Sequence, residues 1–197
     1  MMIHMRSPVR HVIFDRDGVL NAEPHDGGYV TDWAQWRWLP GVLEGLAMLS
    51  SEGVCISIAT NQSCVGRGIL SRGQLETIHA RMLDEAARTG GVINHLFVCR
   101  HAPERGCGCR KPAPGLLRKA LQATGIPRHA TIAVGDDLRD LQAAKSAGIP
   151  AALVRTGKGT LTEATVAGIN VPVFDGIREF ASALLSNSIV LATPEIS

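Results

Sequence analysis

The sequence predicts an α/β protein in which one parallel sheet lies between two layers of helices, a three-layer, Rossmann-like arrangement. Two observations predict this fold class. Short apolar runs alternate along the chain with longer segments whose apolar residues recur at helical spacing. Chemically active polar motifs follow or close several of these apolar runs. Strands that are separated by helices are joined by right-handed crossovers, and such crossovers produce a parallel sheet.

Six apolar runs are expected to be strands. Five of them are short and continuous, as buried strands are. The sixth contains Pro172, which suits the edge of a sheet because proline has no backbone N–H to donate. In chain order the runs are residues 11–14, 54–59, 95–98, 131–134, 151–154 and 171–174.

Five segments are expected to be helices, and their ends carry recognisable signals. Pro40 stands near the start of the first, and Ser71 and Gln74 form a capping box at the start of the second. Gly125 and Gly148 close two others, since glycine readily adopts the left-handed conformation that ends a helix. The segments are residues 40–51, 71–86, 114–124, 138–147 and 177–185.

The composition is that of an ordinary globular protein. The 197 residues are 45% hydrophobic and 19% charged, which suits one domain over residues 1–197 with its core between about residues 10 and 186. A net charge of only +2 argues against a nucleic-acid surface. No apolar run approaches the roughly 20 residues of a membrane span, and residues 1–10 lack the apolar run of a signal peptide. We therefore expect a cytoplasmic monomer that binds neither nucleic acid nor membrane.

Four polar motifs occur at the ends of predicted strands. They are Asp-Arg-Asp-Gly at residues 15–18, Thr-Asn-Gln-Ser at 60–63, Arg-Lys-Pro at 110–112 and Gly-Asp-Asp at 135–137. Ligands of open parallel sheets bind beyond the carboxyl ends of the strands, so we expect the motifs to meet there. Carboxylates, a hydroxyl and an ammonium at one sheet edge suit the transfer of a phosphoryl group with a divalent metal.

The first motif places two carboxylates on one side of the chain. Asp15 and Asp17 are two residues apart, so in an extended backbone both face the cleft while Arg16 turns away. A divalent cation relieves the repulsion between them, and Mg²⁺ prefers such hard oxygen ligands. Asp136 is the natural third oxygen ligand, and Asp137 and Asp140 are candidates for a supporting role.

These motifs resemble the four signature motifs of the haloacid-dehalogenase-like phosphatase superfamily, and the resemblance extends over nearly the whole chain. It implies that Asp15 is the nucleophile and that Asp17 protonates the leaving oxygen and later deprotonates the attacking water. It assigns Mg²⁺ to Asp15, the backbone carbonyl of Asp17, and Asp136. Thr60 and Lys111 would bind and stabilise the transferring phosphoryl group.

A second set of potential ligands lies in the loop of residues 99–111. Cys99, His101, Cys107 and Cys109 offer three thiolates and an imidazole within eleven residues, a standard tetrahedral zinc combination. Four protein ligands leave no open coordination position, so we expect a structural zinc. The metal would fix a loop with little core and thereby position the phosphate-binding lysine. The alternative is a set of reduced cysteines in a mobile loop.

The zinc loop resembles that of two branches of the superfamily, the heptose-bisphosphate phosphatases and the histidinol-phosphate phosphatases. Residues 28–30, 60–68 and 153–158 look like the first branch. The resemblance implies a sugar bisphosphate substrate, from which the 7-phosphate of D-glycero-D-manno-heptose 1,7-bisphosphate is removed. Histidinol phosphate or another small sugar phosphate is the alternative substrate. The residues expected to bind substrate are Asn61, Gln62, Ser63, Arg67, Arg110 and Lys111.

A bisphosphate needs a second anion site away from the metal. Arg67 and Arg110 would provide it, since guanidinium groups bind phosphate oxygens in pairs. A solvated surface arginine is the alternative for each, and Lys158 is a weaker candidate. Asp137 stands where the heptose branch commonly has lysine, which exchanges a positive charge for a negative one near the phosphate. Cys64 replaces a usual glycine.

Two regions beside the motifs bear on substrate access. The three tryptophans at residues 33–38 are expected to form a flap packed on the core, with the stacking of one ring on a sugar face as the alternative. The interval between the second and third motifs leaves little room for a large cap domain, so we expect an open cleft.

Two further functions remain as alternatives. The second motif also resembles that of polynucleotide 3′-phosphatases, although no basic cluster for a nucleic-acid strand is evident. The chain would be a zinc-stapled binding module if it had lost catalysis, although the four catalytic motifs are intact.

Overall fold

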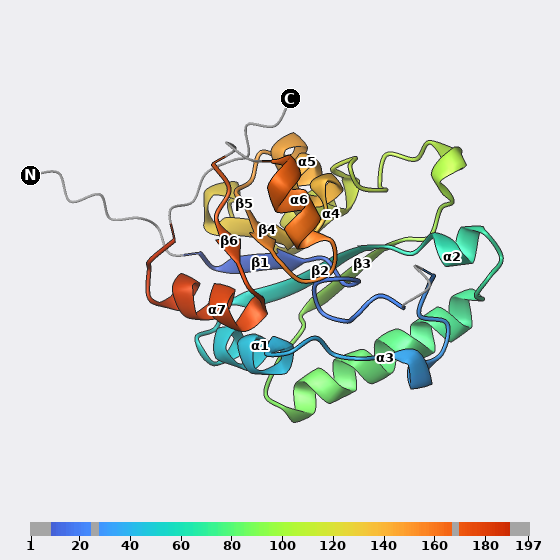
Figure 1. The fold of residues 1–197 in the computed structure, drawn as a ribbon, viewed down its shortest axis with the longest axis horizontal. Coiled ribbons are helices and arrows are strands. Elements are labelled where there is room, and N and C mark those ends of the chain that lie inside the picture. Colours follow the sequence, from blue (N-terminus) through green and yellow to red (C-terminus); the bar gives the residue numbers. More distant parts are fainter. Residues whose placement is uncertain (1–8, 25–27, 167–169, 190–197) are drawn as a thin grey trace, which may run out of the picture.

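A six-stranded parallel sheet forms the middle layer of the protein (Figure 1). The computed structural model describes residues 9–24, 28–166 and 170–189. The strand order is β3-β2-β1-β4-β5-β6, and every neighbouring pair is parallel. The strands are β1 (His11–Phe14), β2 (Cys55–Asn61), β3 (His95–Cys99), β4 (Thr131–Gly135), β5 (Ala151–Val154) and β6 (Val173–Phe174).

Helices cover both faces of this sheet. Figure 1 shows α1, α3 and α7 on one face and α4 and α5 on the other. This arrangement confirms the predicted three-layer α/β/α fold. The helices are α1 (Val42–Ser51), α2 (Ser63–Gly66), α3 (Arg72–Arg88), α4 (Gly115–Thr124), α5 (Leu138–Ala147), α6 (Gly159–Thr165) and α7 (Ile177–Leu185), with short 3₁₀ turns at Trp33–Gln35, Pro103–Arg105 and Arg128–Ala130.

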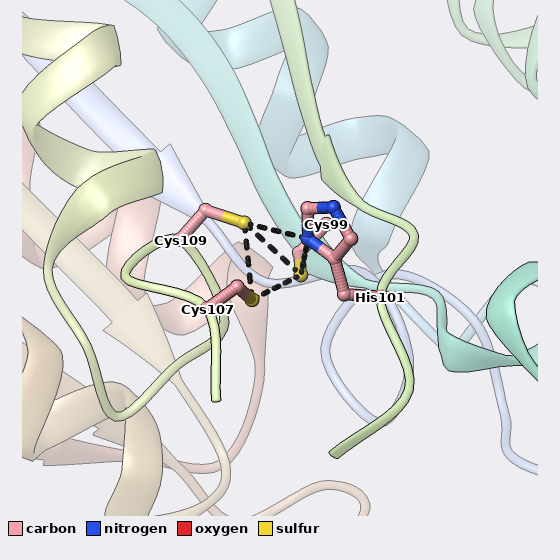
Figure 2. Close-up of side chains that lie close together, drawn as sticks. All are labelled: Cys99, His101, Cys107 and Cys109. Atoms are coloured by element: carbon pink, nitrogen blue, oxygen red, sulfur yellow. Dashed lines mark hydrogen bonds between the residues drawn. The ribbon is translucent and has the colours of Figure 1, made fainter. Parts of the chain in front are cut away.

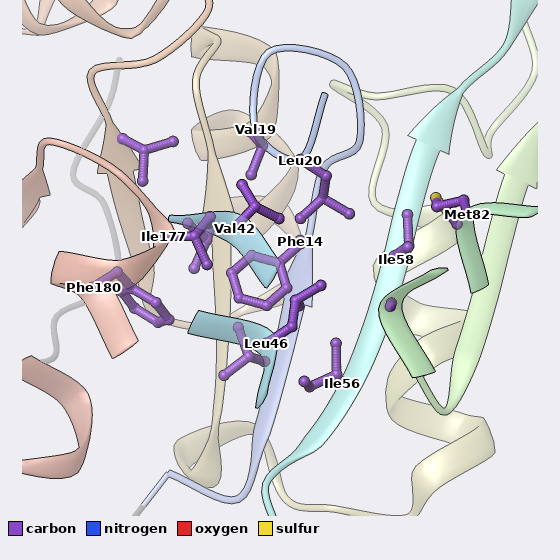
Figure 3. Close-up of a cluster of buried hydrophobic side chains, with 14 of the residues drawn as sticks. Phe14, Val19, Leu20, Val42, Leu46, Ile56, Ile58, Met82, Ile177 and Phe180 are labelled. Carbon is purple, nitrogen blue, oxygen red and sulfur yellow. The ribbon is translucent and has the colours of Figure 1, made fainter. Parts of the chain in front are cut away.

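Each face of the sheet has its own apolar core, because successive side chains of a strand point in opposite directions. Phe14 of β1 lies in the core shared with α1 and α7, where its ring meets that of Phe180 edge-on at 5.9 Å (Figure 3). Its neighbour Ile13 lies in the opposite core with Leu116 of α4 and Leu141 of α5. The central strands are thus buried on both faces, and this fixes their positions.

The register of the central strands brings the polar motifs together. Phe14, the last residue of β1, is level with Ile58 in β2 and with Val134 in β4. Asp15 follows Phe14 directly, and Asp136 comes just after β4. The first and fourth motifs therefore leave the sheet side by side at its carboxyl edge.

Most element boundaries match the predictions to within two residues. The edge strand β6 is shorter than predicted, because it begins at Val173, after Pro172. β2 runs to Asn61, so Thr60 lies inside the strand and not in the turn after it. α1 begins at Val42, after Gly41 with a φ of 74°, rather than at Pro40. The short helices α2 and α6 were not predicted, since segments of this length are too short to show a clear helical period.

Within the described residues, no helix is long and apolar enough to cross a membrane. In the same part of the chain, no separate cap domain is inserted between the strands. Residues 1–10 were predicted not to form a signal peptide. Of these, only residues 9 and 10 are among the described residues.

Candidate active site and metal centre

A cavity of about 200 Å³ lies at the carboxyl edge of the sheet. Its lining combines residues of all four predicted motifs with residues from the segments that follow β1 and β5. Both signs of charge are present, so the cavity suits a phosphate accompanied by a cation. The charged lining residues are Asp15, Asp17, Glu23, Arg110, Lys111, Asp136, Asp137, Arg139, Asp140 and Lys158.

Lys111 is a fixed positive charge beside Asp15. Its Nζ atom lies 2.8 Å from Oδ1 of Asp15 and 2.6 Å from Oδ1 of Asp140. Burial raises the pKa of Asp15 to about 7, even though Lys111 acts to lower it. Burial also acts to lower the pKa of Lys111, but Asp140 and Asp15 outweigh it and the pKa lies above its ordinary value. The ammonium group therefore stays charged where a phosphoryl group would sit.

Asp136 forms a group of three carboxylates with Asp15 and Asp140. One oxygen of each lies within 4.8 Å of the others. Burial, and then the charges of Asp140 and Asp15, raise the pKa of Asp136 to about 8. Hard oxygen atoms crowded in this way fit a divalent cation, which would remove the repulsion between them. Asp15 and Asp136 are two of the predicted magnesium ligands, and Asp140 contacts Lys111.

Two backbone segments close tightly around Asp136. The N–H of Lys158, in the segment after β5, donates to its Oδ2 atom at 2.8 Å. A Cβ at Gly18 or at Gly157 would collide with the carboxylate, and the two glycines have φ values of 82° and 56°. Both positions therefore require glycine, and the carboxylate has little freedom to move.

Asp17 is fixed by donors on both of its oxygens. Oδ1 accepts from Nη2 of Arg16 at 2.6 Å and from Asn21 at 3.0 Å, while Oδ2 accepts from Nε2 of Gln62 at 2.6 Å. Burial raises the pKa of Asp17, but Arg16 and the two amides outweigh burial and hold the pKa below its usual range. Arg16 is buried and lies outside the cavity lining, in agreement with the prediction that it turns away.

The second motif both lines the cavity and positions other residues, since Thr60, Asn61 and Ser63 belong to the lining. Nε2 of Gln62 also donates to the hydroxyl of Thr60 at 2.9 Å, so the Thr60 proton can be donated into the cavity. Gln62 itself is buried and lies outside the lining, so the structure does not bring it to the place of a substrate contact. Asn61 lines the cavity, but its amide pairs with the backbone N–H and C=O of Lys111 at 3.1 and 3.0 Å.

Three cations besides Lys111 line the cavity, namely Arg110, Arg139 and Lys158. Among the described residues, the buried Nη1 atom of Arg110 has no hydrogen-bond partner, so it remains available as a donor to a ligand. Arg67 was expected to share the second anion site, but it lies outside the lining and its nearest acidic partner is Glu104 at 3.6 Å. Arg110 is therefore the better placed of the two arginines.

The negative charge at Asp137 is balanced locally. Asp137 caps α5, and Nε and Nη2 of Arg139 donate to its two oxygens at 3.0 and 2.7 Å. Lys158 lies 3.9 Å away. Burial raises the pKa of Asp137, but the bonds from Arg139 outweigh it and hold the pKa below its usual value. On this side of the cavity the positive charge thus belongs to Arg139, and not to a lysine at position 137.

The tryptophan segment belongs to the core. Trp33 and Trp36 stack with ring centroids 5.2 Å apart, and Trp38 meets Trp36 edge-on at 5.1 Å. Trp36 is buried, and the other two pack against the same core. None of the three lines the cavity, which favours the flap interpretation over stacking on a sugar.

Cys99, His101, Cys107 and Cys109 converge on one point (Figure 2). The Sγ atom of Cys109 lies 3.3 Å from the Sγ atoms of Cys99 and Cys107 and from Nδ1 of His101. Cys99 lies 3.6 Å from Cys107 and 3.7 Å from His101. Thiolates bound tetrahedrally at about 2.3 Å from zinc lie about 3.8 Å apart, so the set fits a zinc ion with slight expansion. The predicted cluster is confirmed, and its ligands suggest zinc.

This cluster joins two elements that flank Lys111. Cys99 ends β3, and the carbonyl of Gly108 accepts from the N–H of Gly115, the first residue of α4, at 3.1 Å. The loop between them carries Lys111. Zinc would thus help to fix the loop that carries the lysine.

Several lining residues were not predicted as site residues. The hydroxyl of Tyr29 lies 2.9 Å from that of Ser63, and both residues line the cavity. Glu23 lies in an irregular segment with no periodic signal. Arg139 was detectable in principle, because a helix beginning at residue 138 places it beside the fourth motif.

Known proteins resemble this chain in sequence and in fold. A HAD-hydrolase-like family model matches residues 108–180. The D-glycero-beta-D-manno-heptose-1,7-bisphosphate 7-phosphatase of Pseudomonas aeruginosa is 38% identical over 174 residues, which cover 88% of this chain and 97% of that protein. The D-glycero-alpha-D-manno-heptose-1,7-bisphosphate 7-phosphatase of Mycobacterium tuberculosis is 35% identical over 179 residues, covering 88% and 90%.

A solved structure extends the similarity to three dimensions. The D,D-heptose 1,7-bisphosphate phosphatase of Bordetella bronchiseptica, in complex with magnesium and phosphate, superimposes with a TM-score of 0.85 at 38% identity. The match covers 90% of this chain and 99% of that one. The chain therefore belongs to the D-glycero-D-manno-heptose-1,7-bisphosphate 7-phosphatase family of the haloacid-dehalogenase-like phosphatases.

Proposed function

We propose that this protein is a magnesium-dependent phosphatase that removes the 7-phosphate of D-glycero-D-manno-heptose 1,7-bisphosphate and leaves heptose 1-phosphate. The observation that carries this proposal is the convergence of Asp15, Asp17, Thr60, Lys111 and Asp136 on one cavity. The relatives of this name match the chain over nearly its whole length, which supports the choice of substrate.

The residues present fit a magnesium ion. Asp15, Asp136 and the backbone carbonyl of Asp17 would hold it, and the ion would supply charge stabilisation to the phosphoryl oxygens. Lys111 would place a second positive charge beside the phosphoryl group, and the hydroxyl of Thr60 would donate one hydrogen bond to it.

The first step is proposed to form a covalent intermediate. An oxygen of Asp15 attacks the phosphorus of the 7-phosphate, and the bond from phosphorus to the oxygen on C7 of the sugar breaks. Asp17 gives that oxygen a proton, so the sugar leaves as an alcohol. Asp17 is ionised in the free protein, and the entry of a phosphate anion raises its pKa, which favours uptake of the proton that is later donated.

The second step hydrolyses the aspartyl phosphate. Asp17 takes a proton from a water molecule, and the oxygen of that water attacks the phosphorus. The bond from phosphorus to Asp15 breaks, which restores the carboxylate and releases inorganic phosphate. The same carboxylate thus donates and accepts a proton in turn.

The distal 1-phosphate requires its own cation. Arg110 fits this task because it lines the cavity and its buried Nη1 atom has no hydrogen-bond partner among the described residues. Ser63 and Tyr29 offer hydroxyl groups to the sugar between the two phosphates. We further propose that residues 10–186 act as one catalytic unit, as a monomer in the cytoplasm.

A comparison of substrates tests this proposal. Phosphate release is measured with Mg²⁺ from both anomers of the heptose bisphosphate and from histidinol phosphate. A strong preference for one heptose anomer is expected and would assign the anomer. A preference for histidinol phosphate, or equal turnover of all three, would contradict the proposed substrate.

A further inference from the structure

A buried cation lies behind Asp17. Arg16 is only 1% exposed and is the largest fully buried side chain in the described part of the protein. Its Nε and Nη2 atoms donate to Oδ1 of Asp17 at 3.2 and 2.6 Å, and its guanidinium carbon lies 5.6 Å from the centroid of the Trp36 ring. A buried charge is costly unless it is paired, so its partners strongly constrain where the guanidinium lies.

His79, on the buried side of α3, is the remaining partner. Its Nε2 atom lies 2.9 Å from Nη1 of Arg16, and the side chain is buried. A guanidinium offers only donors, so Nε2 must accept and the imidazole carries its proton on Nδ1. Burial and the charge of Arg16 lower the pKa of His79 to about 3, which agrees with a neutral ring. Among the described residues, Asp17 and His79 are the hydrogen-bond partners of this guanidinium.

We propose that His79 is a positioning residue that acts through Arg16 to hold the carboxylate of Asp17 in the orientation needed for proton transfer. Among the described residues, Oδ1 of Asp17 accepts from Arg16 and Asn21, whereas Oδ2 accepts only from Gln62. Oδ2 is therefore the oxygen left to exchange a proton with the leaving group. This inference rests on the proposed role of Asp17 in phosphate ester cleavage.

Loss of the imidazole acceptor would loosen this arrangement. Nη1 would be left buried and unpaired, which favours a new position of the guanidinium in which it finds another acceptor. Asp17 would then lose its strongest anchor. Within the described structure, no hydrogen bond or ion pair joins His79 to Lys111 or Thr60, so a defect in phosphate binding is not expected.

The test uses two variants of His79 and two phosphate esters. His79→Leu removes the acceptor, and His79→Gln restores one through its amide oxygen. The kcat/KM for the heptose bisphosphate, an alkyl ester that needs a proton on its leaving oxygen, is compared with that for p-nitrophenyl phosphate, whose leaving group does not. His79→Leu should lower the first value by about tenfold, part of the 10²–10⁴ that acid–base catalysis contributes. It should lower the second by less than about twofold, and His79→Gln should recover most of the loss.

His11 supplies a matched control. It is also a buried histidine, and its Nε2 atom lies 2.8 Å from Oγ of Ser57 in β2. Neither residue lines the cavity. His11→Leu and His11→Gln should change thermal stability without changing the ratio of kcat/KM between the two esters. That ratio separates a positioning effect from a general loss of stability.

Specific outcomes would overturn the proposal. Equal losses on both esters in His79→Leu, or a loss that His79→Gln does not repair, would show that His79 is merely structural. Arg16→Lys keeps the charge but cannot join Asp17 to His79, so it should give the same selective loss even if His79→Leu does not fold. If the wild-type protein fails to cleave the bisphosphate, the proposed substrate is wrong, and any alkyl phosphate that it does cleave takes its place in the comparison.

Discussion

The ammonium group of Lys111 lies 2.8 Å from the Oδ1 atom of Asp15 at the carboxyl edge of the sheet. The two residues are far apart in the chain, and the register of the strands together with the Asn61 amide brings them into contact. This pair places a nucleophile beside the charge that would stabilise the phosphoryl group it attacks.

Asp15→Asn should abolish turnover, with a loss on the order of 10⁴-fold or more, because the amide cannot form the phosphoenzyme. The fold should remain intact, since the substitution keeps the size of the side chain and removes repulsion among three carboxylates. Phosphate release and circular dichroism check both points. Asp175→Asn, at an exposed residue paired with Arg155, is the control that should keep full activity. Substantial activity in Asp15→Asn would exclude the covalent mechanism.

The magnesium dependence should vary with pH. The pKa values of Asp15 and Asp136 are raised to about 7 and about 8 without metal, so protons compete with Mg²⁺ below these values. The Mg²⁺ concentration that gives half-maximal activity should therefore fall as the pH rises from 6 to 8. Titrations of activity against Mg²⁺ at several pH values measure this, and a half-saturating concentration independent of pH would contradict it.

The same carboxylates should make the metal-free protein less stable at higher pH. A carboxyl group with a raised pKa in the folded state stabilises the protein below its unfolded pKa of about 4. That contribution is lost as the pH rises towards 7 and 8. The Tm in EDTA should therefore drop between pH 5 and 8, and Mg²⁺ should raise the Tm most at pH 8. A constant effect of Mg²⁺ across this range would refute the expectation.

The sequence predicts the fold well because the strands are continuous apolar runs and the longer helices carry clear end signals. It also predicts which motifs meet, since residues at the ends of parallel strands share one edge. It does not predict which polar side chains form hydrogen bonds with other groups of the protein. Gln62 and Asn61 are predicted to bind substrate, and the structure adds that their amides bind Asp17, Thr60 and Lys111.

Irregular segments account for most of the remaining differences. Arg67 is close in sequence to the second motif, but α2 intervenes and the arginine ends up outside the cavity lining. Glu23 and Tyr29 lie in a segment without periodic spacing, so no pattern indicates their contact with the cavity. Pairing of Asp137 with Arg139 depends on side-chain rotamers, which sequence periodicity does not specify.

Cys107→Ser should lower zinc content and thermal stability and should reduce kcat. Serine is a poor zinc ligand, and loss of a ligand typically weakens metal binding by at least about 10–100-fold. The loop that carries Lys111 would then be less well fixed. Cys55→Ser is the matched control, because Cys55 lies outside the Cys/His cluster. Elemental analysis of both variants decides the point, and an unchanged zinc stoichiometry in Cys107→Ser would refute the ligand set.

Arg110→Ala should raise the KM for the bisphosphate by about 10–100-fold, the value of about 1.5–3 kcal/mol for hydrogen bonds to a charged group. The effect on heptose 7-phosphate, which lacks the distal phosphate, should be small. Arg72→Ala, at an exposed residue of α3 paired with Glu76, should change neither value. Equal losses on both substrates would show that Arg110 does not bind the distal phosphate.

Product analysis by ³¹P NMR tests the central claim most directly. The purified protein is mixed with D-glycero-D-manno-heptose 1,7-bisphosphate and Mg²⁺, and the resonances of the two phosphates are followed over time. The account predicts that the 7-phosphate signal is replaced by inorganic phosphate while the 1-phosphate signal remains. Loss of the 1-phosphate first, or no phosphate release, would contradict it.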